Sequence, residues 1–275
     1  MSRRPILVFT HIPRTAGMTL ISVLRSVYGI GHCRATQFHR PAPDELRVYT
    51  GADLRLDMRF YPWLRAISGH AVKPFLDYGE VEPRLTWITM LRDPVDRFLS
   101  HYRYYCNRRR ISPTFEEWCA ERGERAANLQ VRWLAGTVDL AAAKEVLARR
   151  FACVGDQADF DTSLATFAAC LGEPRFPTSV GWTINATASG SDALDRDLAA
   201  GFNQLDIELY EHFRSQIWPR QLARHDRTGD RPYVDSVGNR LRRTASLAYH
   251  GAVYKNVRRL SALRHSLAPR LSERP

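Results

Sequence analysis

The sequence predicts an α/β fold in which a mostly parallel sheet is covered by helices on both faces. Two observations predict it. Short apolar runs rich in β-branched residues alternate along the chain with longer segments of helical periodicity. This alternation is typical of parallel sheets, whose strands are joined by crossover helices. The composition, 44% hydrophobic and 25% charged, also supplies enough apolar residues for a full core.

Each element is predicted from a local pattern. Asp93 and Pro94 are suited to the cap and first turn of a helix, and Thr114 with Glu117 has the spacing of a capping box. The Gly69-His70 turn marks the end of a further short element at Ala66–Ser68. The predicted strands are Pro5–Phe9, Leu85–Leu91 and Phe151–Val154, and the predicted helices are Leu20–Tyr28, Asp93 to about Cys106, one from Thr114, Asp139–Arg150, Phe160–Leu171 and Asp192–Phe213.

The positive charge is concentrated in the C-terminal part of the chain. Residues 220–275 hold 13 of the 40 Lys and Arg but only 4 of the 29 Asp and Glu, so they carry +9 of the net charge of +11. We therefore expect a main domain at residues 1–219 and a basic tail at 220–275. Within the tail, Pro219–Gly238 is interpreted as a linker. The spacing of the apolar residues after it fits a basic amphipathic helix or a partly disordered extension: Val253, Val257, Leu260, Leu267 and Leu271.

Several functional classes receive no support from the composition. The nearly balanced main domain does not indicate a nucleic-acid partner. The five cysteines are odd in number and lack a Cys-x-x-Cys pair, so neither a disulfide framework nor a zinc site is expected. No apolar run is long enough to span a bilayer. The predicted location is the cytoplasm, with peripheral contact at an anionic membrane surface as the other option for the tail.

The first motif that indicates chemistry is His11-Ile-Pro-Arg-Thr-Ala-Gly-Met-Thr19, between a predicted strand and a predicted helix. Such a loop directs backbone N–H groups and the positive end of the helix dipole at one point. Ala16 and Gly17 permit close approach of an anion, Thr15 and Thr19 add hydroxyls, and Arg14 adds a charge. The loop is not a Walker A sequence. An ordinary turn with a solvated Arg14 is the alternative.

The second motif is Leu91-Arg-Asp-Pro-Val-Asp-Arg-Phe-Leu-Ser-His-Tyr102. Arg92 lies at the carboxyl end of a predicted strand, where ligands gather in open α/β sheets. Arg97, Ser100 and Tyr104 share one face of the following helix, so Arg92 and Ser100 are predicted to reach one phosphate. The alternative is that Arg97 pairs with a nearby aspartate and Ser100 is merely exposed.

Together, in this order and about 80 residues apart, the two motifs resemble those of the PAPS-dependent sulfotransferases, where PAPS is 3′-phosphoadenosine 5′-phosphosulfate. The resemblance is to the carbohydrate branch that includes heparan sulfate 2-O-sulfotransferase. It implies a P-loop-like three-layer sulfotransferase fold, a 5′-phosphosulfate loop at the first motif and a 3′-phosphate site at the second. In that family, lysine stands where this chain has Arg14, and a hydroxyl residue stands where it has Met18.

The resemblance also implies roles for particular residues. The donor-binding set is Arg14, Thr15, Ala16, Gly17, Met18, Thr19, Arg92 and Ser100. Arg14 is placed to stabilise the leaving oxygen, and PAPS becomes PAP without a metal. His70, within a Gly-His match, is the expected base for the acceptor hydroxyl; His101 is the second choice, and His11 is expected to order the loop. Asn128, Gln130 and Arg132 either face a substrate or pack a helix.

Other functions remain compatible with the sequence. A phosphoryl-transferring P-loop protein would need a loop lysine followed by a Mg²⁺-binding Ser or Thr, a pair that this loop lacks. A nonenzymatic protein that binds polyanions or membrane surfaces through the basic tail is the alternative from another class. The acceptor is expected to be a carbohydrate or another hydroxyl-bearing molecule, on family resemblance alone.

Overall fold

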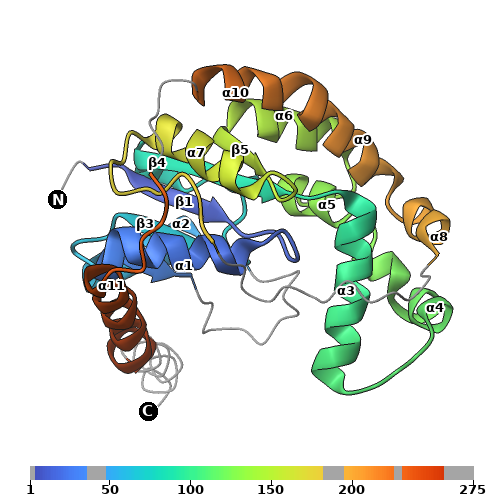
Figure 1. Cartoon of the computed structure of the whole chain (residues 1–275), viewed down its shortest axis with the longest axis horizontal. Helices are drawn as coiled ribbons and strands as arrows, with labels where there is room; N and C mark the ends of the chain where they lie inside the picture. Colours follow the sequence, from blue (N-terminus) through green and yellow to red (C-terminus); the bar gives the residue numbers. More distant parts are fainter. Residues whose placement is uncertain (1–3, 36–47, 182–194, 226–230, 257–275) are drawn as a thin grey trace, which may run out of the picture.

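The computed structural model describes residues 4–35, 48–181, 195–225 and 231–256. A parallel five-stranded sheet with the order β2-β3-β1-β4-β5 lies at its centre, between layers of helices (Figure 1). The predicted α/β class is therefore confirmed. The strands are β1 (Ile6–Thr10), β2 (His32–Arg34), β3 (Ala66–Gly69), β4 (Leu85–Leu91) and β5 (Phe151–Asp156).

The helices largely follow the predicted segments. Asp93 caps α3 through the Asp96 N–H, and Thr114 and Glu117 form the predicted capping box. The α-helices are α1 (Gly17–Tyr28), α2 (Gly51–Phe60), α3 (Pro94–Arg109), α4 (Phe115–Ala126), α5 (Leu129–Ala135), α6 (Leu140–Arg149), α7 (Phe160–Leu171), α8 (Arg196–Gly201), α9 (Gln204–His212), α10 (Trp218–His225) and α11 (Val237–Ala248), and the short helical turns are η1 (Gly29–Gly31), η3 (Gly79–Arg84), η4 (Phe213–Ile217) and η5 (Tyr249–Tyr254).

Alternating side chains of β1 divide the core into two layers. Ile6 and Val8 pack on one face of the sheet with residues of α2, α5, α6 and α9, whereas Leu7 and Phe9 pack on the other face with α1 and α7. All four side chains are almost completely buried. Because both faces are covered, the strand is apolar throughout rather than alternating. Within the described residues, no helix is both long and apolar enough to cross a membrane.

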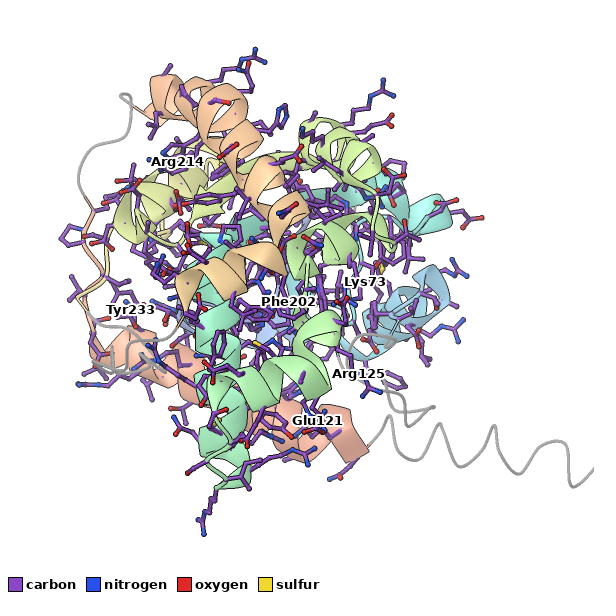
Figure 2. All side chains as sticks on the ribbon, turned by 90° about the vertical axis from the view of Figure 1, so that its right-hand side faces the viewer. Lys73, Glu121, Arg125, Phe202, Arg214 and Tyr233 are labelled. Carbon is purple, nitrogen blue, oxygen red and sulfur yellow. The ribbon has the colours of Figure 1, made fainter. Side chains whose placement is uncertain are left out.

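A third apolar cluster holds α3, α4 and α8 together beside the sheet (Figure 1). Phe98 of α3 stacks on Phe202 with ring centroids 5.6 Å apart and contacts Trp118 of α4 at 5.1 Å. Phe202, labelled in Figure 2, also lies against Gly123, where a Cβ atom would be 2.7 Å from its ring. This packing fixes α3, which begins at the carboxyl end of β4.

The predicted helix Asp192–Phe213 is wrong as a single element. Residues 192–194 lie outside the described residues, and the rest is divided between α8 and α9 at Phe202 and Asn203. The helix is interrupted here because the Asn203 side chain forms two hydrogen bonds outside the regular backbone pattern of a helix. It donates to the Ala199 carbonyl at 2.7 Å and accepts from Arg97 at 3.1 Å. Side-chain bonds of this kind compete with continuation of a helix.

The predicted linker Pro219–Gly238 is also wrong in its first part, because Trp218–His225 is the helix α10. Its Gln221 accepts the Val154 N–H of the edge strand β5 at 3.1 Å, and Trp218 is buried. Pro219 lies just after the π-helical turn η4, and Trp218 before it is still right-handed helical, so the helical path continues from α9 through α10.

Part of the predicted tail also packs on the main body. Arg242 of α11 donates to the Ser26 carbonyl of α1 at 2.8 Å, and Tyr233 (Figure 2) contacts the Ser26 hydroxyl at 3.0 Å. The remaining predicted amphipathic segment at residues 257–275 lies outside the described residues.

Candidate active site

The loop between β1 and α1 has the backbone of an anion-binding turn. Arg14 and Ala16 have positive φ values of 72° and 60°, on either side of Thr15. Alternation between right- and left-handed residues makes successive N–H groups converge on a concave surface. The Thr19 and Leu20 N–H groups both donate to the Ala16 carbonyl, so the N–H groups of Gly17 and Met18 are the ones at the start of α1 that precede its first internal hydrogen bonds.

Several side chains of the loop pack or hydrogen-bond inside the protein, whereas the sequence predicts that they face an anion. The Thr15 hydroxyl donates to the Ile12 carbonyl at 3.0 Å, so its proton closes the loop instead of facing an anion. Thr19 is buried, and Met18 packs against the apolar cluster of α1 and α7. Gly17 lies against the imidazole of His11, where a Cβ atom would be 1.9 Å from Cδ2. Backbone N–H groups and Arg14 are therefore the parts of the loop that could hold an anion.

The two motifs meet at Arg14. Its Nε donates to the Ser100 hydroxyl of α3 at 3.0 Å, and Nη1 of Arg92 donates to the Arg14 carbonyl at 3.2 Å. Strands β1 and β4 are neighbours in the sheet, so their carboxyl ends bring both helix N-termini to the same edge. Residues separated by about 80 positions thus form one cluster, in which Arg14 contacts both Arg92 and Ser100, the two residues predicted to reach one phosphate.

The cluster has the electrostatics of an anion site. Burial and the neighbouring Arg92 both lower the pKa of Arg14, and burial lowers the pKa of Arg92 against the opposite effect of Asp96 and Asp93. An arginine nevertheless remains charged in proteins, so two like charges are held close together in a partly buried position. A phosphate or sulfate bound beside either guanidinium would offset this repulsion.

Gln130 of α5 fixes the backbone of Arg92. Its Oε1 accepts the Arg92 N–H at 3.0 Å, and its Nε2 donates to the Arg92 carbonyl at 2.9 Å. The buried Asp206 in turn accepts the N–H groups of Gln130 and Val131 at 3.0 and 2.8 Å. Gln130 is therefore a packing residue that holds a site residue in place. The sequence alone left open whether Gln130 contacts a substrate or packs a helix.

His70 lies beside the loop, at the end of β3. Its Nδ1 is 2.7 Å from the His11 carbonyl oxygen, and the two imidazole rings stack with centroids 4.1 Å apart. A carbonyl can only accept, so Nδ1 carries the proton and the neutral ring keeps Nε2 as an acceptor. This tautomer is the one that a general base needs.

Two residues next to His70 have no counterpart among the predicted site residues. Lys73 is only 2% exposed, and its Nζ lies 3.1 Å from the ring centroid of Trp133. Trp133 in turn meets the ring of His70 edge to face, with centroids 6.0 Å apart. Two features of the sequence could have marked Lys73 as a site residue: it is one of three lysines among the 40 Lys and Arg residues, and it closely follows the Gly-His pair.

The other histidines fit the base role less well. Burial, aided by nearby arginines, lowers the pKa of His101 to about 3, so it is a weak proton acceptor at neutral pH. His11 is buried, and this burial, together with the nearby His70, lowers its pKa. His11 is stacked between Phe9 and His70, and Gly17 of the loop lies against its ring.

Three further candidates have structural roles. Arg97 is buried, lies 3.8 Å from Asp206 and donates to the Ala126 carbonyl, so it neither faces a phosphate nor pairs with Asp93 or Asp96. Asn128 accepts the Leu205 and Asp206 N–H groups at the start of α9, and Arg132 donates to the Arg125 carbonyl. Among the described residues, no group of His, Cys, Asp and Glu could hold a metal ion.

Comparison with known proteins found sulfotransferases among the solved structures, at low similarity. A sulfotransferase from Alicyclobacillus acidocaldarius is 19% identical with a TM-score of 0.41, over 81% of this chain and 94% of that one. Mouse sulfotransferase SULT7A1 complexed with PAP is 15% identical with a TM-score of 0.39, over 97% and 86%. No protein-family model matches the chain, and the search of curated proteins found no match. These values do not assign the chain to a family.

Proposed function

We propose that this chain is a sulfotransferase that moves the sulfuryl group of PAPS to an acceptor hydroxyl. The observation that carries the proposal is the meeting of the two motifs at Arg14, which contacts both Ser100 and Arg92. A nucleotide with phosphates at both its 5′ and 3′ ends needs two anion sites on one sheet edge. The proposal assigns the 5′-phosphosulfate to the turn before α1 and the 3′-phosphate to the start of α3.

In the proposed reaction, the acceptor oxygen forms a bond to sulfur while the bond from sulfur to the 5′-phosphate oxygen breaks. The electron pair of that bond stays on the leaving PAP, and the acceptor proton passes to His70. Arg14 places a permanent positive charge beside the leaving oxygen, and the N–H groups at the start of α1 add to this stabilisation. Because Nδ1 of His70 is bonded to the His11 carbonyl, the ring has a fixed orientation and presents Nε2 as the base.

Carbohydrate is the acceptor class that we propose, and this choice rests on the resemblance of the motifs alone. The competing phosphotransferase reaction would require a hydroxyl that holds Mg²⁺ behind a loop cation. The Thr15 hydroxyl donates to the Ile12 carbonyl, and the loop cation is an arginine, so neither residue suits that role.

The test is transfer from PAPS to a panel of glycans by the full-length chain, with sulfated product detected by mass spectrometry. We expect His70→Ala to lower turnover by roughly 10²- to 10⁴-fold, the usual contribution of a general base, while PAP binding stays close to that of the wild type. Arg92→Ala should instead weaken PAP binding. Phosphate transfer from ATP with Mg²⁺, in the absence of any transfer from PAPS, would overturn the proposal.

A further inference from the structure

Arg14 differs from the lysine of the pattern that the loop resembles, and the difference changes what the site must provide. An ammonium is a compact charge, so its effect on a nearby oxygen does not depend on rotation about the side chain. A guanidinium is flat, and its N–H groups lie in a plane, so its effect on a nearby oxygen depends on the orientation of that plane. An arginine at this position therefore needs neighbours that fix its plane.

Two contacts among the described residues hold the Arg14 guanidinium. The Nε–H donates in the plane of the group to the Ser100 hydroxyl at 3.0 Å. The ring of Tyr104 faces the guanidinium, with Cζ 4.9 Å from the ring centroid. A planar cation over an aromatic face is attracted by the ring quadrupole. The first contact thus restrains the direction of the Nε–H, and the second holds Cζ over the ring.

Tyr104 is itself held in place along α3. It follows Ser100 by four residues, so both side chains lie on one face of the helix. Four residues further on, Nη1 of Arg108 donates to the Tyr104 hydroxyl at 3.0 Å. The ring is 39% exposed, which places it at the surface of the site and not in the core.

We propose that Tyr104 is a positioning residue for sulfuryl transfer, which orients the Arg14 guanidinium toward the oxygen that leaves with PAP. The inference rests on the proposed function of the chain. Its effect is expected mainly on turnover, because charge on the leaving oxygen develops in the transition state and not in the bound donor.

Tyr105 provides a matched control on the same helix. Its ring also contacts arginines, with the Cζ atoms of Arg109 and Arg122 at 5.2 and 4.8 Å from the centroid. These arginines belong to α3 and α4 and not to the loop before α1. Replacing Tyr105 by leucine therefore removes a tyrosine with two such contacts and leaves Arg14 untouched.

The experiment compares kcat, the KM for PAPS and thermal unfolding of full-length wild type, Tyr104→Phe, Tyr104→Leu and Tyr105→Leu. For Tyr104→Leu we expect kcat to fall about tenfold with KM changed less than threefold. Tyr104→Phe keeps the aromatic face and should stay within about twofold of wild type, as should Tyr105→Leu. Unchanged melting temperatures would show that each variant folds.

Three results would overturn the inference. Equal kcat values for Tyr104→Leu and Tyr105→Leu would show that the ring has no specific role. An equal loss in Tyr104→Phe and Tyr104→Leu would assign the effect to the hydroxyl and Arg108. A wild-type chain that transfers nothing from PAPS would remove the proposed function and this inference with it, whereas the first two results leave the proposed function intact.

Discussion

Replacing Gln130 by methionine keeps the approximate size of the side chain and removes both hydrogen bonds to the Arg92 backbone. A neutral hydrogen bond contributes about 1 kcal/mol, and a buried group left without a partner costs about 1–3 kcal/mol. Gln130 is completely buried, so we expect the free energy of unfolding to fall by about 2–4 kcal/mol.

The same substitution should weaken nucleotide binding, because Arg92 loses the support that fixes its position. A hydrogen bond between charged groups is worth about 1.5–3 kcal/mol, which corresponds to roughly 10- to 100-fold in the dissociation constant. Calorimetric titration with PAP measures this change, and urea unfolding measures the loss of stability in the same preparation.

Gln221→Met is the control for this experiment. Gln221 is also a buried glutamine that accepts a backbone N–H, that of Val154, but it lies on α10 against the outer strand β5. It should lose stability with PAP affinity unchanged. If Gln130→Met and Gln221→Met lose equal stability and both bind PAP like the wild type, Gln130 has no part in positioning Arg92.

Two further substitutions test the loop and the C-terminal helix. Gly17→Ala should abolish PAP binding and destabilise the chain by about 1–3 kcal/mol, because the new Cβ overlaps the stacked ring of His11. Gly201→Ala is the control, since a Cβ at Gly201 meets no atom within 4 Å, and this variant should bind PAP normally. Burial lowers the pKa of His250 to about 4, below the value near 6.5 in the unfolded chain. As the pH drops, the unfolded chain therefore binds a proton at His250 before the folded chain does. The free energy of unfolding should fall between pH 6.5 and 4, by up to about 1.4 kcal/mol per pH unit. His250→Gln should reduce this slope in urea unfolding between pH 7 and 5, and an unchanged slope would contradict the assignment.

Most of the fold could be predicted because its strands and helices carry strong local patterns. The strand Leu85–Leu91 and the helix Phe160–Leu171 have the predicted boundaries. The strand β2 has only three residues, too few for periodicity to reveal. The division between α8 and α9 depends on bonds of Asn203 to distant partners, which no local pattern contains.

The site could be predicted in part. Motif spacing indicated that Arg14, Arg92 and Ser100 belong together, because neighbouring parallel strands end at one edge of the sheet. The burial of Arg97 against Asp206 could not be predicted, because its partner lies more than 100 residues away on α9. The same holds for Gln130, whose role depends on where α5 packs, and for the contact of Tyr104 with Arg14 across two elements.

The central claim is that both motifs form one site for a nucleotide with 5′ and 3′ phosphates. The most direct test is calorimetry of the full-length chain with PAP and with 5′-AMP, which lacks the 3′-phosphate, for wild type and Arg92→Ala. We expect PAP to bind at micromolar concentration or tighter, 5′-AMP at least tenfold more weakly, and Arg92→Ala to reduce this difference. Equal affinity for the two nucleotides, or no binding of PAP at micromolar concentrations, would contradict the account.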